Sequence, residues 1–544
     1  MAVLRTFASQ APRGARCFTN AANTAAAAAT ATQHGGIGQG SLAEMSTESL
    51  RKELDGRGLV SGGSRAELLE RLMVARSQEA ERPLQRLSRA RNKASQLELG
   101  NGERISAARK VFLGTNYSTT YQEPLHITRA SGQYMYDGDG RQYLDGYNNV
   151  PHVGHCHPRV ADAVGNQMKT LQTNTRYLYK HLPEYAARLA SLFPKPLSHV
   201  FFVNSGSEAN DMALRIALAH TGGDTIITHQ EAYHGNTIAC QGVSPTAHYN
   251  PQSGVSEGKR RSPTEQSERL LALKTFAVPF PDPYRPQSSE PLTGFAAAQK
   301  VDSVMEESAQ DGGELAAMIV ESILGVGGQV LYPQNYLAEV AKSVRQRKGL
   351  FILDEVQTGF GRIGSHLWAF EDPHHGGVVP DIVTLGKPMG NGFPLAAVVT
   401  TAELATVLKG EYFNTFGGAP VACAAGMAVL DVLEEEHLCS NAEWVGKFMM
   451  SELRNLSARH PCIGDVRGSG LFLGIEMVKD PTTKEPAAAL CRAVVNRMKD
   501  QGVLVSYDGP LQNVIRIKPP MCFSHKNAEM LVDRLDDSIT RLLR

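Results

Sequence analysis

The sequence predicts an α/β fold with a mostly parallel β-sheet between helices, preceded by a small helical module. From about residue 105, helical stretches alternate with short apolar runs at 200–203, 317–320, 350–353, 382–385 and 396–399. Continuous apolar strands between helices are typical of a parallel sheet covered on both faces. Residues 46–76 instead show two short helical patterns, and residues 1–43 contain no Asp or Glu.

The composition is that of a globular protein and argues against several functional classes. Lys plus Arg and Asp plus Glu each number 55 in the 544 residues, so the formal net charge is zero. This balance argues against a globally basic nucleic-acid binder. The 8 Cys show no CxxC spacing, so we expect neither a disulfide framework nor a zinc module. No apolar run approaches the roughly 18 residues of a membrane span, and we expect no membrane partner.

Residues 1–40 have the composition of an organelle transit peptide. This segment carries Arg5, Arg13 and Arg16 together with an Ala-rich run at 25–29, and it lacks acidic residues. Arg-rich, acid-poor segments of this kind are typical of transit peptides. We expect a mitochondrial location, with a plastid location or a cytoplasmic protein with an unstructured tail as the alternatives.

Residues 46–76 predict a helical hairpin. Thr47 is expected to cap the first helix and Ser64 the second. The segment resembles a SAP motif, a helix–extension–helix module often found on DNA-binding proteins, through Leu54, Gly58, Leu59, Gly62, Leu68 and Leu72. Two interpretations stay open: contact with DNA phosphates, or a solvated charged hairpin whose acidic residues offset Arg51, Lys52, Arg57, Arg65 and Arg71. Residues 77–104 are polar and are predicted to be a linker or an exposed helix.

Two strands of the predicted sheet end in residues suited to chemistry. Asp354 ends the apolar run LFILD, and Lys387 follows the run DIVTL among small residues. Acidic residues at the carboxyl ends of parallel strands lie where such sheets place ligands. A desolvated Lys amine is a usable nucleophile. Taken singly, a turn acid and a surface lysine are the simpler interpretations.

A third strand leads into a predicted anion site. The run VFFV is followed by Asn204, Ser205, Gly206 and Ser207 and then by a helix, so free backbone N–H groups are expected there. Tyr233 lies in a loop after another β-like run and could stack on a planar ring. Together with Asp354 and Lys387, these features meet the requirements of pyridoxal phosphate (PLP), which needs a lysine, an acidic partner for its ring nitrogen and a phosphate site.

Over residues 110–544 the sequence resembles the class-III aminotransferase family, of PLP fold type I. The matching motifs are NSGSEAND, YHG, LDEVQTGFGR, GKPMGNG, NTFGG and RGSGLFLGIE. The resemblance implies that Lys387 carries PLP, that Asp354 pairs with the pyridinium nitrogen, that Tyr233 stacks on the ring and that Gln357 bonds the ring hydroxyl. Phosphate binding is implied for Gly206, Ser207 and, from the neighbouring subunit, Thr415.

The resemblance also implies the organisation of the catalytic part. It would be a homodimer with shared active sites, in which Glu208 and Glu321 support the site. A PLP-binding large domain would span residues 161–430. The smaller α+β domain would combine residues 105–160 with residues 431–544.

Finer motifs bear on the reaction. NNVPHVGHCHP, TNTRYLY and IKPPMCF look most like the phospho-lyases that act on ethanolamine phosphate or 5-phosphohydroxylysine. Arg516 departs from that pattern, because it lies where many family aminotransferases hold a substrate carboxylate. Val326 occupies the position at which several ω-aminotransferases have a Glu that gates this arginine. The phospho-lyase is the preferred interpretation, and a transaminase of alanine–glyoxylate type is the alternative.

Further residues suggest substrate contacts, the absence of a metal site and a second class of function. Substrate phosphate recognition is predicted for Asn148, Asn149, Arg176 and Lys518, with interface or solvated roles as the alternative. His152, His155, Cys156 and His157 fit no standard zinc spacing, and no metal is expected. A hypothesis of another class is a DNA-binding protein, tethered through the SAP-like segment, with an inactive enzyme core.

Overall fold

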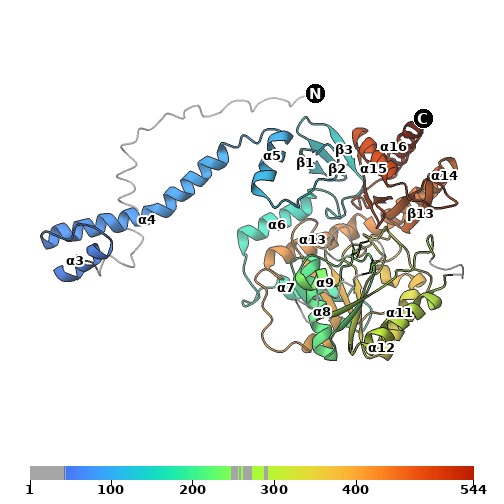
Figure 1. The fold of residues 1–544 in the computed structure, drawn as a ribbon, viewed down its shortest axis with the longest axis horizontal. Helices are drawn as coiled ribbons and strands as arrows, with labels where there is room; N and C mark the ends of the chain where they lie inside the picture. Colours follow the sequence, from blue (N-terminus) through green and yellow to red (C-terminus); the bar gives the residue numbers. More distant parts are fainter. Residues whose placement is uncertain (1–41, 43, 247–254, 257–258, 261–272, 287–291) are drawn as a thin grey trace, which may run out of the picture. The chain divides into compact units, whose positions relative to one another are not determined.

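The computed structural model describes residues 42, 44–246, 255–256, 259–260, 273–286 and 292–544. The predicted transit peptide at 1–40 therefore lies outside the described residues. The chain divides into two compact units, Met1–Leu113 and Gly114–Arg544 (Figure 1). The division falls later than the predicted boundary at 104/105, because the helix Gly102–Phe112 belongs to the first unit.

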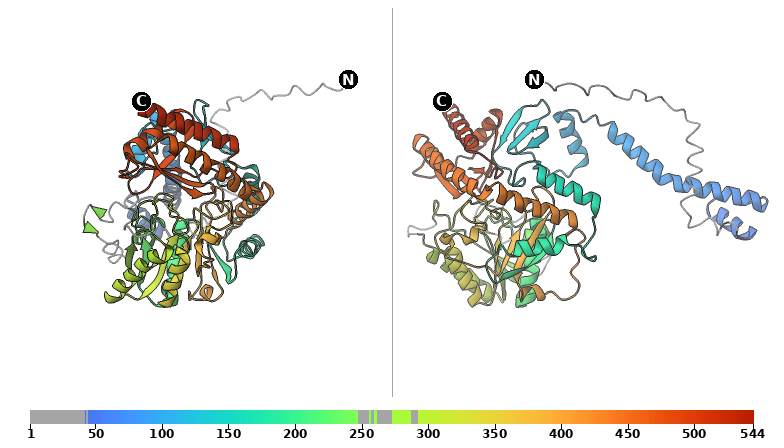
Figure 2. Two further views of the ribbon diagram at one scale, coloured as in Figure 1. Left: turned by 90° about the vertical axis from the view of Figure 1, so that its right-hand side faces the viewer. Right: turned by 180° about the vertical axis from the view of Figure 1, so that it is seen from behind.

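The described residues of the first unit form α3 (Thr47–Gly56), α4 (Arg65–Ser95) and α5 (Gly102–Phe112), with α4 the long blue helix in Figures 1 and 2. Ser46, not Thr47, caps α3: it is extended, and its hydroxyl accepts the N–H of Ser49 at 3.1 Å. Ser64 caps α4 as predicted and forms a capping box with Glu67. The predicted linker is helical through Ser95.

The hairpin has its own small core and pairs part of its charge internally. Apolar side chains from both helices and from Leu42, which precedes them, bury one another; those of the helices are Leu50, Leu54, Leu68 and Leu72. Arg57 pairs with Glu53 at 2.9 Å and also with Glu79, while Arg71 donates to the carbonyl of Val60 at 3.0 Å. The carboxylates of Glu53 and Glu79 offset the charge of Arg57, so less positive charge is available to a polyanion. The SAP resemblance and the DNA contact remain predictions.

The second unit is built on a mixed seven-stranded sheet in the order β4-β12-β11-β10-β9-β5-β8. Its strands are β4 (Leu197–Val203), β5 (Thr225–His229), β8 (Lys274–Val278), β9 (Leu315–Glu321), β10 (Leu350–Asp354), β11 (Ile382–Leu385) and β12 (Ala396–Thr401). Pairing is parallel from β11 through β10, β9 and β5 to β8, and β12 is antiparallel to both of its neighbours. Each of the predicted apolar runs lies within one of these strands.

Both faces of this sheet are buried, which explains the continuous apolar runs. Ala317 and Ile319 of β9 pack with α8 (Gly206–Thr221) in one apolar cluster. Met318 and Val320 of the same strand belong to the other cluster, with side chains from α11 (Gly294–Gln310), α12 (Tyr336–Gln346) and α13 (Pro420–Glu435). The predicted α/β fold class is confirmed.

Two smaller sheets lie beside the large one. The order β1-β2-β3-β15 joins Ile127–Ser131, Tyr134–Asp137 and Gln142–Asp145 to Val503–Leu504, so the two expected parts of the small domain share a sheet. The antiparallel sheet β13-β14-β17-β16 comprises Ile463–Ser469, Phe472–Met477, Val514–Ile517 and Ser506–Asp508. A short hairpin pairs β6 (Val255–Ser256) with β7 (Lys259–Arg260).

The described residues also form the α-helices α6 (Pro158–Thr170), α7 (His181–Ala190), α9 (Ile238–Gly242), α14 (Leu438–Arg459), α15 (Ala488–Asp500) and α16 (His525–Leu543). Within the described part of the chain, no helix combines the length and the apolar character that crossing a membrane requires.

Candidate active site

A cavity of about 110 Å³ lies where β9, β10 and β11 end and α8 begins. It is lined by Gly206, Ser207, Asn210, Tyr233, His234, Gly235, Glu321, Asp354, Val356, Gln357 and Lys387. The carboxyl ends of the parallel strands thus gather the strand-end acid, the lysine, the aromatic side chain and the helix start that the sequence singled out.

Asp354 ends β10 and is held in place by three hydrogen bonds. Its Oδ2 accepts hydrogen bonds from Nδ2 of Asn210 and Nδ1 of His234, both at 2.8 Å. Its Oδ1 accepts a hydrogen bond from the backbone N–H of Val356 at 2.9 Å. The residue is only 5% exposed. A carboxylate fixed by donors on three separate segments is preorganised for a cationic partner in the cavity.

Lys387 follows β11 and its amine enters the same cavity. Burial lowers the pKa of Lys387, while the charges of Asp354 and Glu321 oppose this shift. Burial also raises the pKa of Glu321 to about 7, and this carboxyl accepts the backbone N–H groups of Gly325 and Tyr233. A larger neutral fraction of the Lys387 amine is thereby available to attack a carbonyl or to take a proton.

The start of α8 provides an anion site. Ser205 caps the helix and accepts the N–H of Glu208 at 3.2 Å, which leaves the N–H groups of Gly206 and Ser207 at the open end. Gly235, with φ +134°, packs directly on Ser207: an added Cβ would lie 2.4 Å from its hydroxyl oxygen. The close approach of these two segments requires glycine at 235.

These residues fit PLP. The fixed Asp354 carboxylate suits a protonated ring nitrogen, the Lys387 amine suits the aldehyde, and the N–H groups at the α8 start suit the phosphate. Tyr233 lines the cavity and is available to the ring face. The role of each residue stays a prediction, but PLP binding requires all of these residues to lie at one cavity, and they do.

A polar group next to the cavity contains two of the predicted substrate residues. The Oε1 of Gln357 accepts Nδ2 of Asn149 at 3.1 Å and Nζ of Lys518 at 3.3 Å. Burial lowers the pKa of Lys518 to about 7, against the opposing charge of Asp508. Gln357 lines the cavity, so its amide connects Asn149 and Lys518 to the cavity.

Besides Asn148, Asn149 and Lys518, three more predicted residues are not among those that line the cavity. Arg176 has a side chain that is 57% exposed, pairs with Glu411 and lies over the ring of Phe413. Thr415 is exposed, two residues from Phe413. Arg516 pairs with Asp508 at 2.8 Å and lies near the ring of Tyr147.

Sequence reasoning missed Asn210, His234 and Asp508. Asn210 lies three residues after Ser207 on α8, so its helical spacing could have placed it on the cavity face. His234 adjoins the predicted Tyr233 but was given no role. No local signal pointed to Asp508, because it comes from a strand of another sheet.

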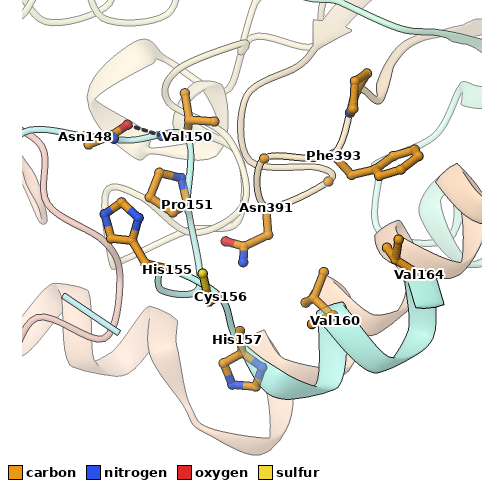
Figure 3. Close-up of a pocket in the computed structure, with 14 residues that line it drawn as sticks. Asn148, Val150, Pro151, His155, Cys156, His157, Val160, Val164, Asn391 and Phe393 are labelled. Atoms are coloured by element: carbon orange, nitrogen blue, oxygen red, sulfur yellow. Dashed lines mark hydrogen bonds between the residues drawn. The ribbon is translucent and has the colours of Figure 1, made fainter. Parts of the chain in front are cut away.

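A second cavity, of about 500 Å³, adjoins the Gly390–Gly392 loop that follows Lys387 (Figure 3). It lies between Val160 and Val164 of α6, the 148–157 loop and Asn391. His155 pairs with Asp145 at 2.7 Å and His157 with Glu436 at 2.9 Å. Across the described ranges, no group of three or more His, Cys, Asp or Glu is placed to hold a metal ion.

Comparison with known families settles the class. Residues 116–539 match the model of the family described as aminotransferase class-III. The chain belongs to the class-III aminotransferase family. It is accordingly a PLP-dependent enzyme of fold type I, which confirms the resemblance seen in the motifs and the cofactor they imply.

Relatives within the family carry names of two kinds. The chain is 44% identical to a Drosophila melanogaster protein named "Alanine--glyoxylate aminotransferase 2-like", over 78% of this chain and 84% of the relative. It is 40% identical to "Ethanolamine-phosphate phospho-lyase homolog 1" of Caenorhabditis elegans, over 83% and 96%. It is 42% identical to "Alanine--glyoxylate aminotransferase 2 homolog 2, mitochondrial" of Arabidopsis thaliana, over 80% and 87%.

A solved structure is also similar. A phospholyase from Arthrobacter in complex with phosphoethanolamine matches with a TM-score of 0.72 and 37% identity. The match covers 80% of this chain and 99% of the Arthrobacter chain, so its fold is that of the second unit.

Proposed function

We propose that this class-III enzyme is a phospho-lyase that releases phosphate, ammonia and an aldehyde from ethanolamine phosphate or 5-phosphohydroxylysine. The observation that carries the proposal is the buried amine of Lys518, which with Asn149 contacts Gln357 at the cavity wall. A buried cation and an amide donor at this place suit a substrate phosphate. The similar Arthrobacter phospholyase, whose structure was solved with phosphoethanolamine, supports the same proposal. Transamination of alanine–glyoxylate type is the second candidate, favoured by the presence of Arg516.

The chain's own groups divide the work of this reaction. When bound, PLP supplies an electron sink for negative charge on the carbon that bears the substrate nitrogen. Lys387, with its lowered pKa, takes the proton from that carbon at its amine. Asp354 would hold its carboxylate towards the ring nitrogen of PLP and so favour the protonated ring. The phosphate leaves from the next carbon with the electrons of its C–O bond, towards Lys518 and Asn149, and one water completes the release of ammonia and aldehyde.

Replacement of Lys518 by Met should raise the KM for ethanolamine phosphate about tenfold or more, because a charge-assisted hydrogen bond to the phosphate is lost. Phosphate release by purified, PLP-loaded protein measures this. Lys447→Met is the matched control, since the Lys447 side chain is 75% exposed and should leave KM unchanged. Equal KM values for Lys518→Met and the control would refute the role of Lys518.

The Lys518→Met variant also tests how substrate binding depends on pH. The pKa of Lys518 is lowered to about 7, so its amine is charged below that pH and neutral above it. Binding of the phosphate through a charged Lys518 should therefore weaken as the pH rises through 7. We expect kcat/KM for ethanolamine phosphate to fall over this range in the wild type, and this part of the fall to be missing in Lys518→Met.

We also propose that the enzyme is a homodimer whose partner contributes to each active site. Two exposed segments lie side by side, because Tyr179 donates to the carbonyl of Gly418 at 2.7 Å and Arg176 covers the ring of Phe413. They expose the apolar side chains of Tyr177, Leu178, Phe413 and Phe416. Thr415 lies within this surface, as expected of a residue that reaches the partner's phosphate site.

A charge at Leu178 should break the dimer. This side chain is 103% exposed, and burying a leucine contributes about 1.5–3 kcal/mol. Leu178→Glu is expected to run as a monomer in sedimentation analysis at micromolar concentration. Leu84→Glu, at a leucine 66% exposed on α4, should remain a dimer. An intact Leu178→Glu dimer would contradict this placement of the interface.

A mitochondrial location is proposed on two grounds. The Arabidopsis thaliana relative is named as mitochondrial. The acid-free, Arg-containing composition of residues 1–40 is independent of that name.

A further inference from the structure

Arg516 forms an ion pair with the buried carboxylate of Asp508. Its Nη1 donates to Oδ1 of Asp508 at 2.8 Å, across the pairing of β17 with β16. The Asp508 side chain is only 4% exposed and that of Arg516 is 22% exposed. A charge-assisted hydrogen bond with so little access to water is much stronger than a surface ion pair.

The carboxylate of Asp508 is anchored on its other side as well. Its Oδ2 accepts Nε2 of Gln329 at 3.0 Å and lies 3.9 Å from Nζ of Lys518. The next residue, Gly509, donates its N–H to the carbonyl of Val326 at 2.9 Å, so β16 is tied to the loop that follows β9. Asp508 therefore faces Arg516 from a fixed position.

Asp508 links Arg516 to the wall of the cavity. Its Oδ2 lies 3.9 Å from Nζ of Lys518, and that amine donates to Oε1 of the cavity-lining Gln357 at 3.3 Å. The positive charge of Arg516 also contributes to lowering the pKa of both Lys387 and Lys518. A substrate carboxylate next to the reacting nitrogen would approach this guanidinium in the presence of the Asp508 carboxylate. It would have to displace Asp508 or share Arg516 with it, against the repulsion of two like charges.

We propose that Asp508 is a specificity-determining residue: by occupying Arg516 it disfavours donors that carry a carboxylate on the carbon of the reacting amine. Donors without that carboxylate, such as ethanolamine phosphate, leave the Arg516–Asp508 pair in place. The inference rests on the proposed function in that it explains why such amines are preferred over amino acids. It concerns recognition only and adds no chemical step.

The test is the binding of L-alanine to PLP-loaded full-length protein, followed through the change in cofactor absorbance. Asp508→Asn should lower the Kd for L-alanine at least fivefold, because Arg516 is no longer neutralised. In the Arg516→Gln background the same change should alter Kd by less than twofold, which assigns the gain to Arg516. In turnover with glyoxylate, the effect should fall on KM for alanine more than on kcat.

An L-alanine Kd that is unchanged or raised in folded, PLP-loaded Asp508→Asn would overturn the proposal. An equal decrease in the L-alanine Kd in the Arg516→Gln background would also overturn the proposal. Removal of the Asp508 charge would then attract anions in general, without acting through Arg516. If Asp508→Asn fails to load PLP, Asp508→Ser, which is smaller and uncharged, serves in the same comparison. Alanine binding is measured without ethanolamine phosphate, so failure of the phospho-lyase assignment is seen separately, as absent phosphate release by the wild type.

Discussion

Replacement of Lys387 by Ala is expected to abolish turnover, with a loss of about 10²–10⁴-fold or more from removal of the general base alone. Lys387 lines the cavity together with Asp354 and Glu321, and among the described residues no other lysine lines it. Borohydride reduction followed by peptide mass analysis gives a readout that does not depend on activity. The wild type should retain PLP on the peptide that contains Lys387, and the variant should retain none there.

Lys447→Ala, at an exposed side chain, is the control and should keep both activity and the modified peptide. A Lys387→Ala protein that turns over within tenfold of the wild type would show that another group carries the proton. Retention of PLP on a different lysine would show that the cavity has been misassigned.

Asp354→Asn is expected to lower kcat by about 10²–10³-fold, the effect of removing one preorganised charge from a buried site. The geometry should be nearly kept, but the Asn amide must face the donors of Asn210 and His234, which costs about 1–3 kcal/mol of stability. The variant's thermal midpoint and PLP content check that the loss is not unfolding.

Asp354→Asn should also shift the pKa of Lys387. The charge of Asp354 helps to keep the pKa of Lys387 up against burial, so its removal should lower that pKa further. Reductive methylation of the apoprotein over a range of pH reports the Lys387 pKa directly. Asp533→Asn, at an exposed aspartate of α16, is the control. A pKa of Lys387 that rises or stays constant in Asp354→Asn would contradict the electrostatic role.

The large sheet and the cofactor residues could be predicted because their signals are local. Strands buried on both faces appear as uninterrupted apolar runs, and Asp354 and Lys387 stand directly at the ends of two such runs. Ser205 likewise directly precedes the helix that it caps, and Gly206 and Ser207 are the first residues of that helix. Position along the chain was enough to bring these residues to one edge of the sheet.

Contacts between distant segments could not be predicted in this way. The absence of a Glu at Val326 was visible in the sequence, but the carboxylate that faces Arg516 comes from Asp508 on another strand. The His234 and Asn210 bonds to Asp354 join positions more than 100 residues apart. Such pairings depend on how sheets and helices pack.

In the N-terminal unit, the sequence did not decide which residue caps α3 or whether residues 77–95 are helical. Thr47 and Ser46 are both good capping residues, and only the backbone conformation shows that Ser46 accepts the helix N–H. Residues 77–95 lack an apolar periodicity that would separate an exposed helix from a linker. Their helical state therefore had no sequence signal beyond propensity.

The stoichiometry of products from ethanolamine phosphate tests the central claim most directly. Purified, PLP-loaded enzyme should release one phosphate and one ammonia for each aldehyde formed, without glyoxylate and without net conversion of the cofactor. Absence of phosphate release, together with glyoxylate-dependent consumption of L-alanine, would contradict the phospho-lyase assignment and establish the transaminase instead.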